Sequence, residues 1–246
     1  MADYDNRALR NPAATIAGTI DAGLRAYMLR VYNYMLVGLG LTGLTAWVVA
    51  NVPSVTALFF EATPTGIALS GLGWVAFIAP LAMVFFLSFR IQSMSLGAAQ
   101  GTFWGYAALV GVSLAPILML YTGASTARVF FITASTFGAM SLWGYTTKRD
   151  LTGFGSFLMM GLIGLLIAVV VNIFMASSMM DFVISVIGVL IFTGLTAYDT
   201  QSIKESYYAQ ADGTTAGKMA IMGALRLYLD FINLFVMLMR LLGNRR

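Results

Sequence analysis

The sequence predicts an all-α polytopic membrane protein, and three observations support that prediction. Of the 246 residues, 59% are hydrophobic and only 10% are charged, whereas an average soluble domain is about one-quarter charged. Apolar runs of about 20 residues, each long enough to cross a bilayer as a helix, recur along almost the whole chain. The connectors between these runs are short. A soluble protein with a single hydrophobic core is therefore not expected.

Seven transmembrane helices are predicted from these runs. Their expected ranges are 31–50, 67–88, 98–120, 127–146, 154–176, 182–201 and 219–242. They divide the chain into a cytoplasmic N-terminal segment, a seven-helix transmembrane domain and a short basic tail, at residues 1–30, 31–242 and 243–246. The longest internal connector, SIKESYYAQADGTTAGK, precedes the last span and contains an Asp-Gly turn signal.

The N-terminal segment is mostly polar, so no cleavable signal peptide is predicted and the first span is expected to act as its own targeting signal. Ile16, Ile20, Leu24 and Tyr27 have the spacing of a short interfacial helix. An ordinary cytoplasmic lead fits the same residues equally well.

The distribution of Lys and Arg predicts the orientation. Nine of these residues fall on one side of the spans: Arg7, Arg10, Arg25, Arg30, Arg90, Lys148, Arg149, Lys204 and Lys218. The opposite connectors carry only Arg128. Because cytoplasmic loops are enriched in Lys and Arg, the N-terminus should be cytoplasmic and the C-terminus outside. Arg245 and Arg246 conflict with this, so either the tail is an exception or the last segment re-enters; seven crossings are favoured.

Two Trp-Gly-Tyr triplets, at 104–106 and 143–145, are expected at the cytoplasmic ends of their spans. Amphipathic aromatic residues anchor helices at that depth. A membrane-interface belt is therefore predicted rather than a ligand cage.

Missing residue types exclude several functions. The chain has no Cys and no His, which excludes disulfides, thiol catalysis, Cys-based metal sites and His-based catalysis. Phosphate-binding and dinucleotide-binding motifs are also missing. Neither an enzyme nor a cofactor is expected, and the modest net charge of +4 gives no reason to expect nucleic acid. Any pH response near neutrality must come from carboxylates, because no His is present.

One carboxylate lies near the middle of the last apolar run. Eight of the ten acidic residues sit in the N-terminal segment, the connectors or their edges, but Asp230 does not. Arg226, Asp230, Asn233, Met237 and Arg240 are spaced by four and three residues, so they form one polar face of a helix. A central charge facing lipid costs about 2.5 to 3.5 kcal/mol. The last span should therefore be enclosed by other helices or line a watery cavity.

Asp199, near the cytoplasmic end of the sixth span, is the second exception. Because the sixth and seventh spans are consecutive and antiparallel, Asp199 and Asp230 can meet. Two poorly solvated carboxylates cannot both ionise cheaply, so they are expected to share a proton and act as a pH-sensing, ion-gating pair. Without the proton they offer a transient hard-cation site suited to calcium.

Simpler roles fit the same residues. Arg226 and Asp230 can merely neutralise each other as neighbours one turn apart. Asp199 alone can be a helix-end carboxylate at the headgroup boundary. Arg90, after the second span, can counter-charge the pair or serve only as a topology residue.

GLTAYDTQ at 194–201, LYLDFINLF in the last span and GVSLAPIL at 111–118 together resemble the Bax inhibitor-1 family in a bacterial form. The resemblance extends from the first span to Leu242. It implies six helices around a central seventh, in agreement with the enclosed last span inferred above. It also implies a pH-sensitive calcium leak governed by an aspartate pair that matches Asp199 and Asp230, and an arginine of the second span that pairs with it. Arg90 is the candidate for that arginine.

Two departures from the family pattern stand out. The basic tail of some eukaryotic members is reduced here to NRR. Arg226 adds a positive charge one turn from Asp230, which favours the ionised form of that carboxylate.

The predicted function is a passive calcium leak of the bacterial inner membrane, with lipid, calcium ions and protons as its partners. The alternative is a non-transporting regulator that binds a membrane-anchored quality-control protease or another membrane protein. A third possibility, a proton-coupled solute transporter, would be expected to have a larger apolar cavity.

Overall fold

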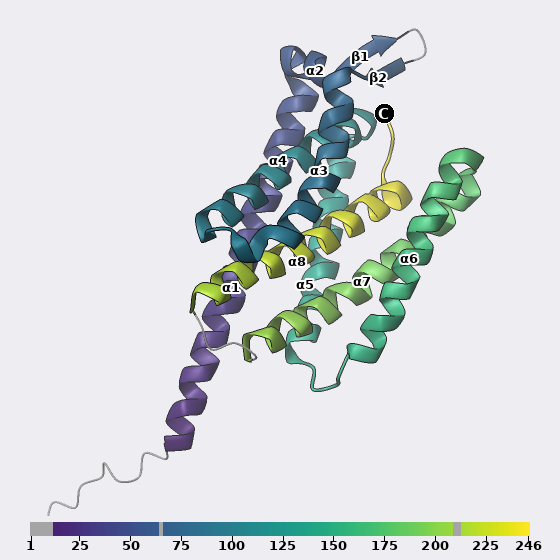
Figure 1. The fold of residues 1–246 in the computed structure, drawn as a ribbon. Coiled ribbons are helices and arrows are strands. Elements are labelled where there is room, and N and C mark those ends of the chain that lie inside the picture. The colour runs from purple at the N-terminus through teal and green to yellow at the C-terminus, as the bar shows by residue number, and fades with distance from the viewer. Residues whose placement is uncertain (1–11, 64–65, 209–212) are drawn as a thin grey trace, which may run out of the picture.

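A computed structural model describes residues 12–63, 66–208 and 213–246 (Figure 1). In chain order the elements are α1 (Pro12–Asn51), α2 (Pro53–Phe59), β1 (Phe60–Thr63), β2 (Gly66–Leu69), α3 (Gly71–Arg90), the 3-10 turn η1 (Ile91–Ser93), α4 (Leu96–Leu120), α5 (Gly123–Thr146), α6 (Thr152–Met175), α7 (Ser178–Tyr208) and α8 (Gly213–Leu242). The prediction of a helical protein is confirmed, with one small hairpin added.

Short polar residues divide the apolar chain into separate helices. The hydroxyl groups of Ser70, Ser95 and Thr122 each accept a hydrogen bond from a backbone N–H in the first turn of α3, α4 and α5. Such caps satisfy donors that a helix start leaves without an intrahelical partner. At the other end of a helix, Ala176 closes α6 in the left-handed conformation, with φ of 49°.

Six helices in the described part of the chain are long and apolar enough to cross a membrane: α1, α3, α4, α6, α7 and α8. They identify a multi-pass membrane protein. The predicted fourth span corresponds to α5, which has 24 residues. Ser, Thr and Gly lower its hydropathy, so it is not among the six and the count of seven is not confirmed.

The predicted second span is wrong at its start. Residues 67–69 belong to strand β2, which pairs antiparallel with β1 in the register Phe60 to Leu69 and Thr63 to Gly66. The Ser70 hydroxyl donates to the Leu58 carbonyl at 2.6 Å, and α3 begins only after it. Hydropathy continues smoothly through this segment, so it could not separate a strand from the helix that follows.

The helices of the first and sixth spans are longer than predicted, the first at its start and the sixth mainly at its end. Helix α1 begins at Pro12, so residues 12–30 continue the first span as one helix. Leu24 and Tyr27, considered for an interfacial helix, are buried in the protein core; the side chains of Ile16 and Ile20 lie outside the described part. Much of the long predicted connector is also helical, because α7 extends to Tyr208 and α8 begins at Gly213.

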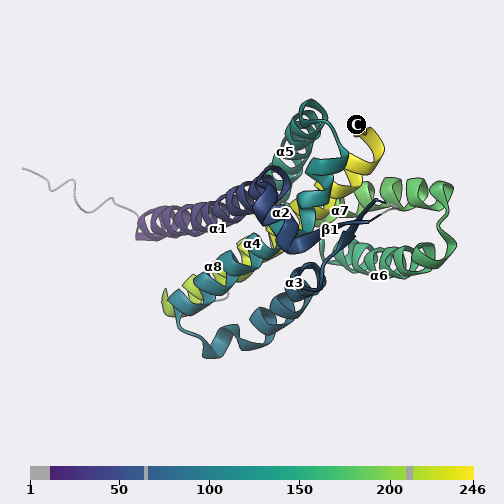
Figure 2. The same ribbon diagram turned by 90° about the horizontal axis from the view of Figure 1, so that it is seen from above.

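Helix α8 is the most enclosed of the candidate spans. Of its most apolar stretch, 61% is buried inside the protein, against 17% for α3 and 11% for α6. It lies between α1 and α4 on one side and α7 on the other (Figures 1 and 2), and it also contacts α5. Helix α3 packs on α4 and α6 packs on α7, without extended contact with α8. The enclosed last span is therefore found, but a ring of six helices around it is not confirmed.

Helix α8 runs from one end of α4 to the other. Near its start, the Lys218 ammonium donates to the carbonyl of Gln92, in the turn before α4. After its end, the backbone N–H of Arg246 donates to the Leu120 carbonyl at 2.9 Å. The Arg245 guanidinium lies 5.9 Å from the ring centre of Tyr121. The basic tail is thus fastened to the α4–α5 connector, which favours a crossing helix over a re-entrant one.

The two Trp-Gly-Tyr triplets have different environments. Trp143 is exposed on α5, as an interface anchor would be. Tyr106 is buried on α4 and packs edge-on against Tyr228 of α8, with ring centres 5.7 Å apart. The belt interpretation therefore suits the second triplet better than the first.

Candidate functional site

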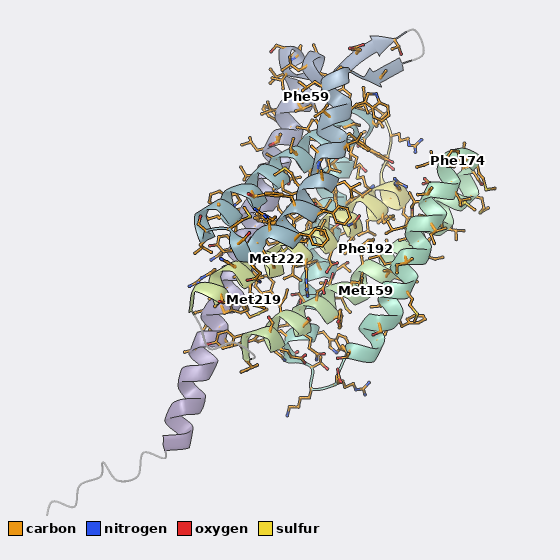
Figure 3. The ribbon with its side chains drawn as sticks, in the orientation of Figure 1. Phe59, Met159, Phe174, Phe192, Met219 and Met222 are labelled. Atoms are coloured by element: carbon orange, nitrogen blue, oxygen red, sulfur yellow. The ribbon has the colours of Figure 1, made fainter. Side chains whose placement is uncertain are left out.

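Asp199 and Asp230 line the same cavity, which has a volume of about 510 Å³ and lies between α6, α7 and α8. Their consecutive, antiparallel helices pack along each other, which places both carboxyl groups on the wall of this one cavity. Apolar residues from all three helices form most of the remaining wall; Figure 3 labels Met159 on α6 and Phe192 on α7.

The two carboxyl groups differ in their surroundings. Asp230 is only 4% exposed, and its Oδ2 atom is buried without a hydrogen-bond partner among the described residues. Asp199 is partly exposed. A buried carboxyl oxygen without a partner carries a desolvation cost, which a shared proton or a bound cation can reduce. The site therefore has unused capacity to accept a proton or a cation.

Arg226 lines the cavity beside the two acids but is exposed. It makes no direct ion pair with either acid, since the described part of the chain holds a single such pair, elsewhere. As a permanent cation that lines the same cavity, it attracts negative charge on either acid. Arg226 is therefore a nearby counter-charge. The interpretation that it neutralises Asp230 through a contact ion pair is wrong.

Other predicted site residues lie apart or are bonded elsewhere. Arg240 forms the ion pair just mentioned, with Asp181 at 2.8 Å near the start of α7. Asn233 lines the cavity, but its amide donates to the backbone carbonyl of Leu229 at 2.9 Å. Arg90 is exposed at the end of α3 and is not among the residues that line the cavity. The structure thus groups Asn233 with the acids and separates Arg90 and Arg240 from them.

A hydroxyl chain that the sequence did not predict joins α1, α5 and α7 outside the aspartate cavity. The Tyr32 hydroxyl on α1 lies 2.6 Å from the Ser141 hydroxyl on α5, which lies 2.9 Å from the Thr200 hydroxyl on α7. Thr200 in turn donates to the Thr196 carbonyl at 2.7 Å. Thr200 follows Asp199 directly in the sequence, which was an available signal. Nothing in the local sequence marked Ser141.

The residues after Thr200 hold the α5–α6 connector. Gln201 is buried; its amide oxygen accepts from Leu151 N–H and its amide nitrogen donates to the Arg149 carbonyl, both at 2.8 Å. One turn later, the Lys204 ammonium donates to the Tyr145 carbonyl at 2.8 Å. The end of α7 that carries Asp199 is therefore fastened to the end of α5 and to the α5–α6 connector.

Comparisons with known proteins identify the family of this chain. Residues 24–246 match the family model described as inhibitor of apoptosis-promoting Bax1. The chain is 48% identical over 227 residues to the inner membrane protein YbhL of Escherichia coli, covering 92% of this chain and 94% of that one. It is 50% identical over 228 residues to an uncharacterized protein of Rickettsia prowazekii, covering 93% of each. An uncharacterized protein of Caulobacter vibrioides is 43% identical over the full length of both chains. The chain therefore belongs to the Bax inhibitor-1 family.

Proposed function

We propose that this protein is a pH-sensitive, passive calcium leak of the bacterial inner membrane, with no enzymatic step and no cofactor. One observation carries the proposal: Asp199 and Asp230 line one cavity within the helix bundle, and an oxygen of Asp230 is buried without a partner. The name of the relative YbhL supports the inner membrane as the location. Intramembrane carboxylates of this kind commonly mark proton or ion pathways.

In the proposed topology α5 also crosses the membrane, which brings the number of spans to seven. Its 24 residues measure about 36 Å at about 1.5 Å per residue, which exceeds a hydrocarbon core of about 30 Å. The N-terminus is cytoplasmic, which places Lys148, Arg149 and Lys204 on the cytoplasmic side. The cavity that holds Asp199 and Asp230 then lies in the cytoplasmic half of the bilayer. Helix α8 is the inner helix of the bundle.

A shared proton acts as a latch in this proposal. When one carboxyl group keeps its proton, it can donate a hydrogen bond to the other and hold α7 against α8. When the proton leaves, two negative charges face each other in a poorly solvated cavity and repel. Deprotonation therefore weakens the contact between α7 and α8, and it also changes the charge that an entering cation meets.

Calcium is the proposed permeant ion because carboxylate oxygens are hard ligands. A resident calcium ion takes about six to eight oxygen ligands. The described residues contain no cluster of three or more acidic side chains, so the pair supplies only part of such a shell and water supplies the rest. Partial coordination favours transit over storage. Without an energy-coupling motif in the sequence, flux runs down the calcium gradient.

The test is calcium flux into liposomes that hold purified protein and a trapped indicator, measured at several pH values. Asp199→Asn and Asp230→Asn keep the side-chain volume and remove the titrating groups. Asp181→Asn is the matched control, because Asp181 is an exposed acid of α7 that is paired with Arg240 instead. The expected result is a pH-dependent leak in the wild type and the control, and a flat pH profile in both pair variants.

The outcomes separate the competing functions. Flux no faster than in empty liposomes contradicts the leak and leaves a regulator of another membrane protein, such as a quality-control protease. That regulator would be tested by asking whether another membrane protein co-purifies with the full-length chain. Flux with an unchanged pH profile in both pair variants retains a leak but rejects the aspartate sensor. A proton current that requires an added solute would instead indicate a proton-coupled transporter.

A further inference from the structure

A second groove lies between α1 and α5, away from the aspartate cavity. These two helices make no extended contact with each other, and a hollow of about 540 Å³ lies between them. The lining residues that matter here are one cation and five apolar or small residues, namely Arg25, Met28, Leu29, Phe137, Gly138 and Leu142. The groove thus combines a charged end with a mostly apolar length, and the Tyr32 and Ser141 hydroxyl groups, 2.6 Å apart, link α1 to α5 within it.

The rims of this groove are apolar and exposed. Leu29 on α1 is 52% exposed and Leu142 on α5 is 64% exposed. The adjacent Trp143 is also exposed. Large exposed hydrophobic side chains on a membrane protein contact acyl chains, so the groove opens sideways into the bilayer. An occupant can therefore enter from the membrane without passing through water.

The floor of the groove has room for a hydrocarbon chain. Gly138 lines the groove, and a Cβ atom added to it would meet no other heavy atom within 4 Å. Deeper in, Phe137 packs edge-on against Phe231 of α8, with ring centres 5.5 Å apart. The aromatic residue closes the groove toward the core, while the glycine leaves space along α5.

Positive charge gathers at one end of the groove. Arg25 is exposed and has no ion-pair partner among the described residues. Tyr145, at the same end of α5, also lines the groove, and its carbonyl accepts a hydrogen bond from the Lys204 ammonium. Two cations therefore lie at the end where α1 and α5 leave the apolar region. An anionic group is the complementary ligand for such a place.

We propose that this groove binds one anionic phospholipid from the membrane. Its phosphate lies at Arg25, and one acyl chain lies along Met28, Phe137 and Gly138. A phospholipid fits because it carries an anion and a hydrocarbon chain in the same order in which the groove presents a cation and an apolar floor. The site does not depend on the proposed calcium leak, and its test measures lipid binding alone.

The experiment is native mass spectrometry of the full-length protein with dioleoyl phosphatidylglycerol or dioleoyl phosphatidylcholine added to the detergent. Arg25→Gln is expected to lower retention of the phosphatidylglycerol by about tenfold, as for loss of about 1.4 kcal/mol of charge-assisted hydrogen bonding. Gly138→Leu fills the open space and is expected to lower retention of both lipids. Each variant is checked for a wild-type circular dichroism spectrum.

Two matched controls complete the design. Arg30→Gln removes an exposed cation of α1 that does not line the groove. Gly164→Leu adds the same side chain at an open position on α6. Equal losses for Arg25→Gln and Arg30→Gln would reduce the effect to general surface charge and overturn the site. Unchanged binding in Gly138→Leu, equal retention of the two lipids by the wild type, or displacement by soluble glycerol phosphate would overturn it as well.

Discussion

Gln201 provides the sharpest test of how the aspartate-bearing end of α7 is held. Gln201→Ala removes two hydrogen bonds of 2.8 Å, from Leu151 N–H and to the Arg149 carbonyl. A typical hydrogen bond contributes about 1 kcal/mol net, and a buried donor left without a partner costs about 1 to 3 kcal/mol. Leu151 is buried, so its N–H has no easy access to water. The expected loss is therefore about 2 to 4 kcal/mol in the free energy of unfolding.

The assay is unfolding of the purified protein in mixed micelles, together with amide hydrogen exchange of the α5–α6 connector. Gln201→Glu keeps the acceptor for Leu151, but it loses the donor to Arg149 and puts a charge at a buried position, so at neutral pH its loss should be at least as large as that of Gln201→Ala. Gln92→Ala is the control, because the Gln92 side chain is exposed and only its backbone carbonyl is used. A Gln201→Ala protein with wild-type stability and a still-protected Leu151 amide would refute the reasoning.

Three further predictions follow from single contacts. Gly144→Val places a Cβ against a backbone carbonyl of α7 and should destabilise the fold by about 1 to 3 kcal/mol or more, whereas Gly164→Val, at an open position, should change unfolding little. Arg240→Gln breaks an ion pair whose side chains are 39% and 40% exposed, so unfolding should change by less than about 1 kcal/mol and the change should vanish in high salt. Hydrogen bonds from the Thr152 hydroxyl and backbone N–H hold the pKa of Asp150 below its ordinary value of 3.8. The contact is therefore present at neutral pH and is lost as pH falls through the lowered pKa. Nuclear magnetic resonance titration of Asp150 should show this lowered midpoint, and Thr152→Ala should move it back toward 3.8.

The sequence located the long helices but not all of their ends. Each of the seven predicted ranges overlaps one long helix of the structure, because apolar residues must be removed from water over a length set by the bilayer. Hydropathy carries no information on hydrogen-bond pattern, so it missed the hairpin at 60–69. It also began the first helix too late, at residue 31 instead of Pro12, and ended the sixth too early, at residue 201 instead of Tyr208, because both helices continue outside the most apolar region.

The aspartate pair was accessible from sequence because two consecutive antiparallel helices must lie near each other, and each carries one acid in an apolar setting. Cations were harder to place. Arg226 lies in the same cavity as the pair because it is one turn from Asp230 on the same helix. Arg240 instead forms an ion pair with Asp181 near the start of α7. Arg90 lies on α3, which packs on α4 and makes no extended contact with α7 or α8.

By itself, the sequence determined that this chain is a helical membrane protein of the Bax inhibitor-1 family with two acids in its last two spans. Composition and hydropathy suffice for the helical spans and the placement of the acids, whereas the family follows from the motifs at 111–118 and 194–201 and in the last span. Only the tertiary structure decided that Arg226 makes no contact ion pair with Asp230, that Tyr32, Ser141 and Thr200 form one chain, and that α1 and α5 leave a groove. The reason is physical: these features depend on distances between helices far apart in sequence, which the packing of α8 among its neighbours sets.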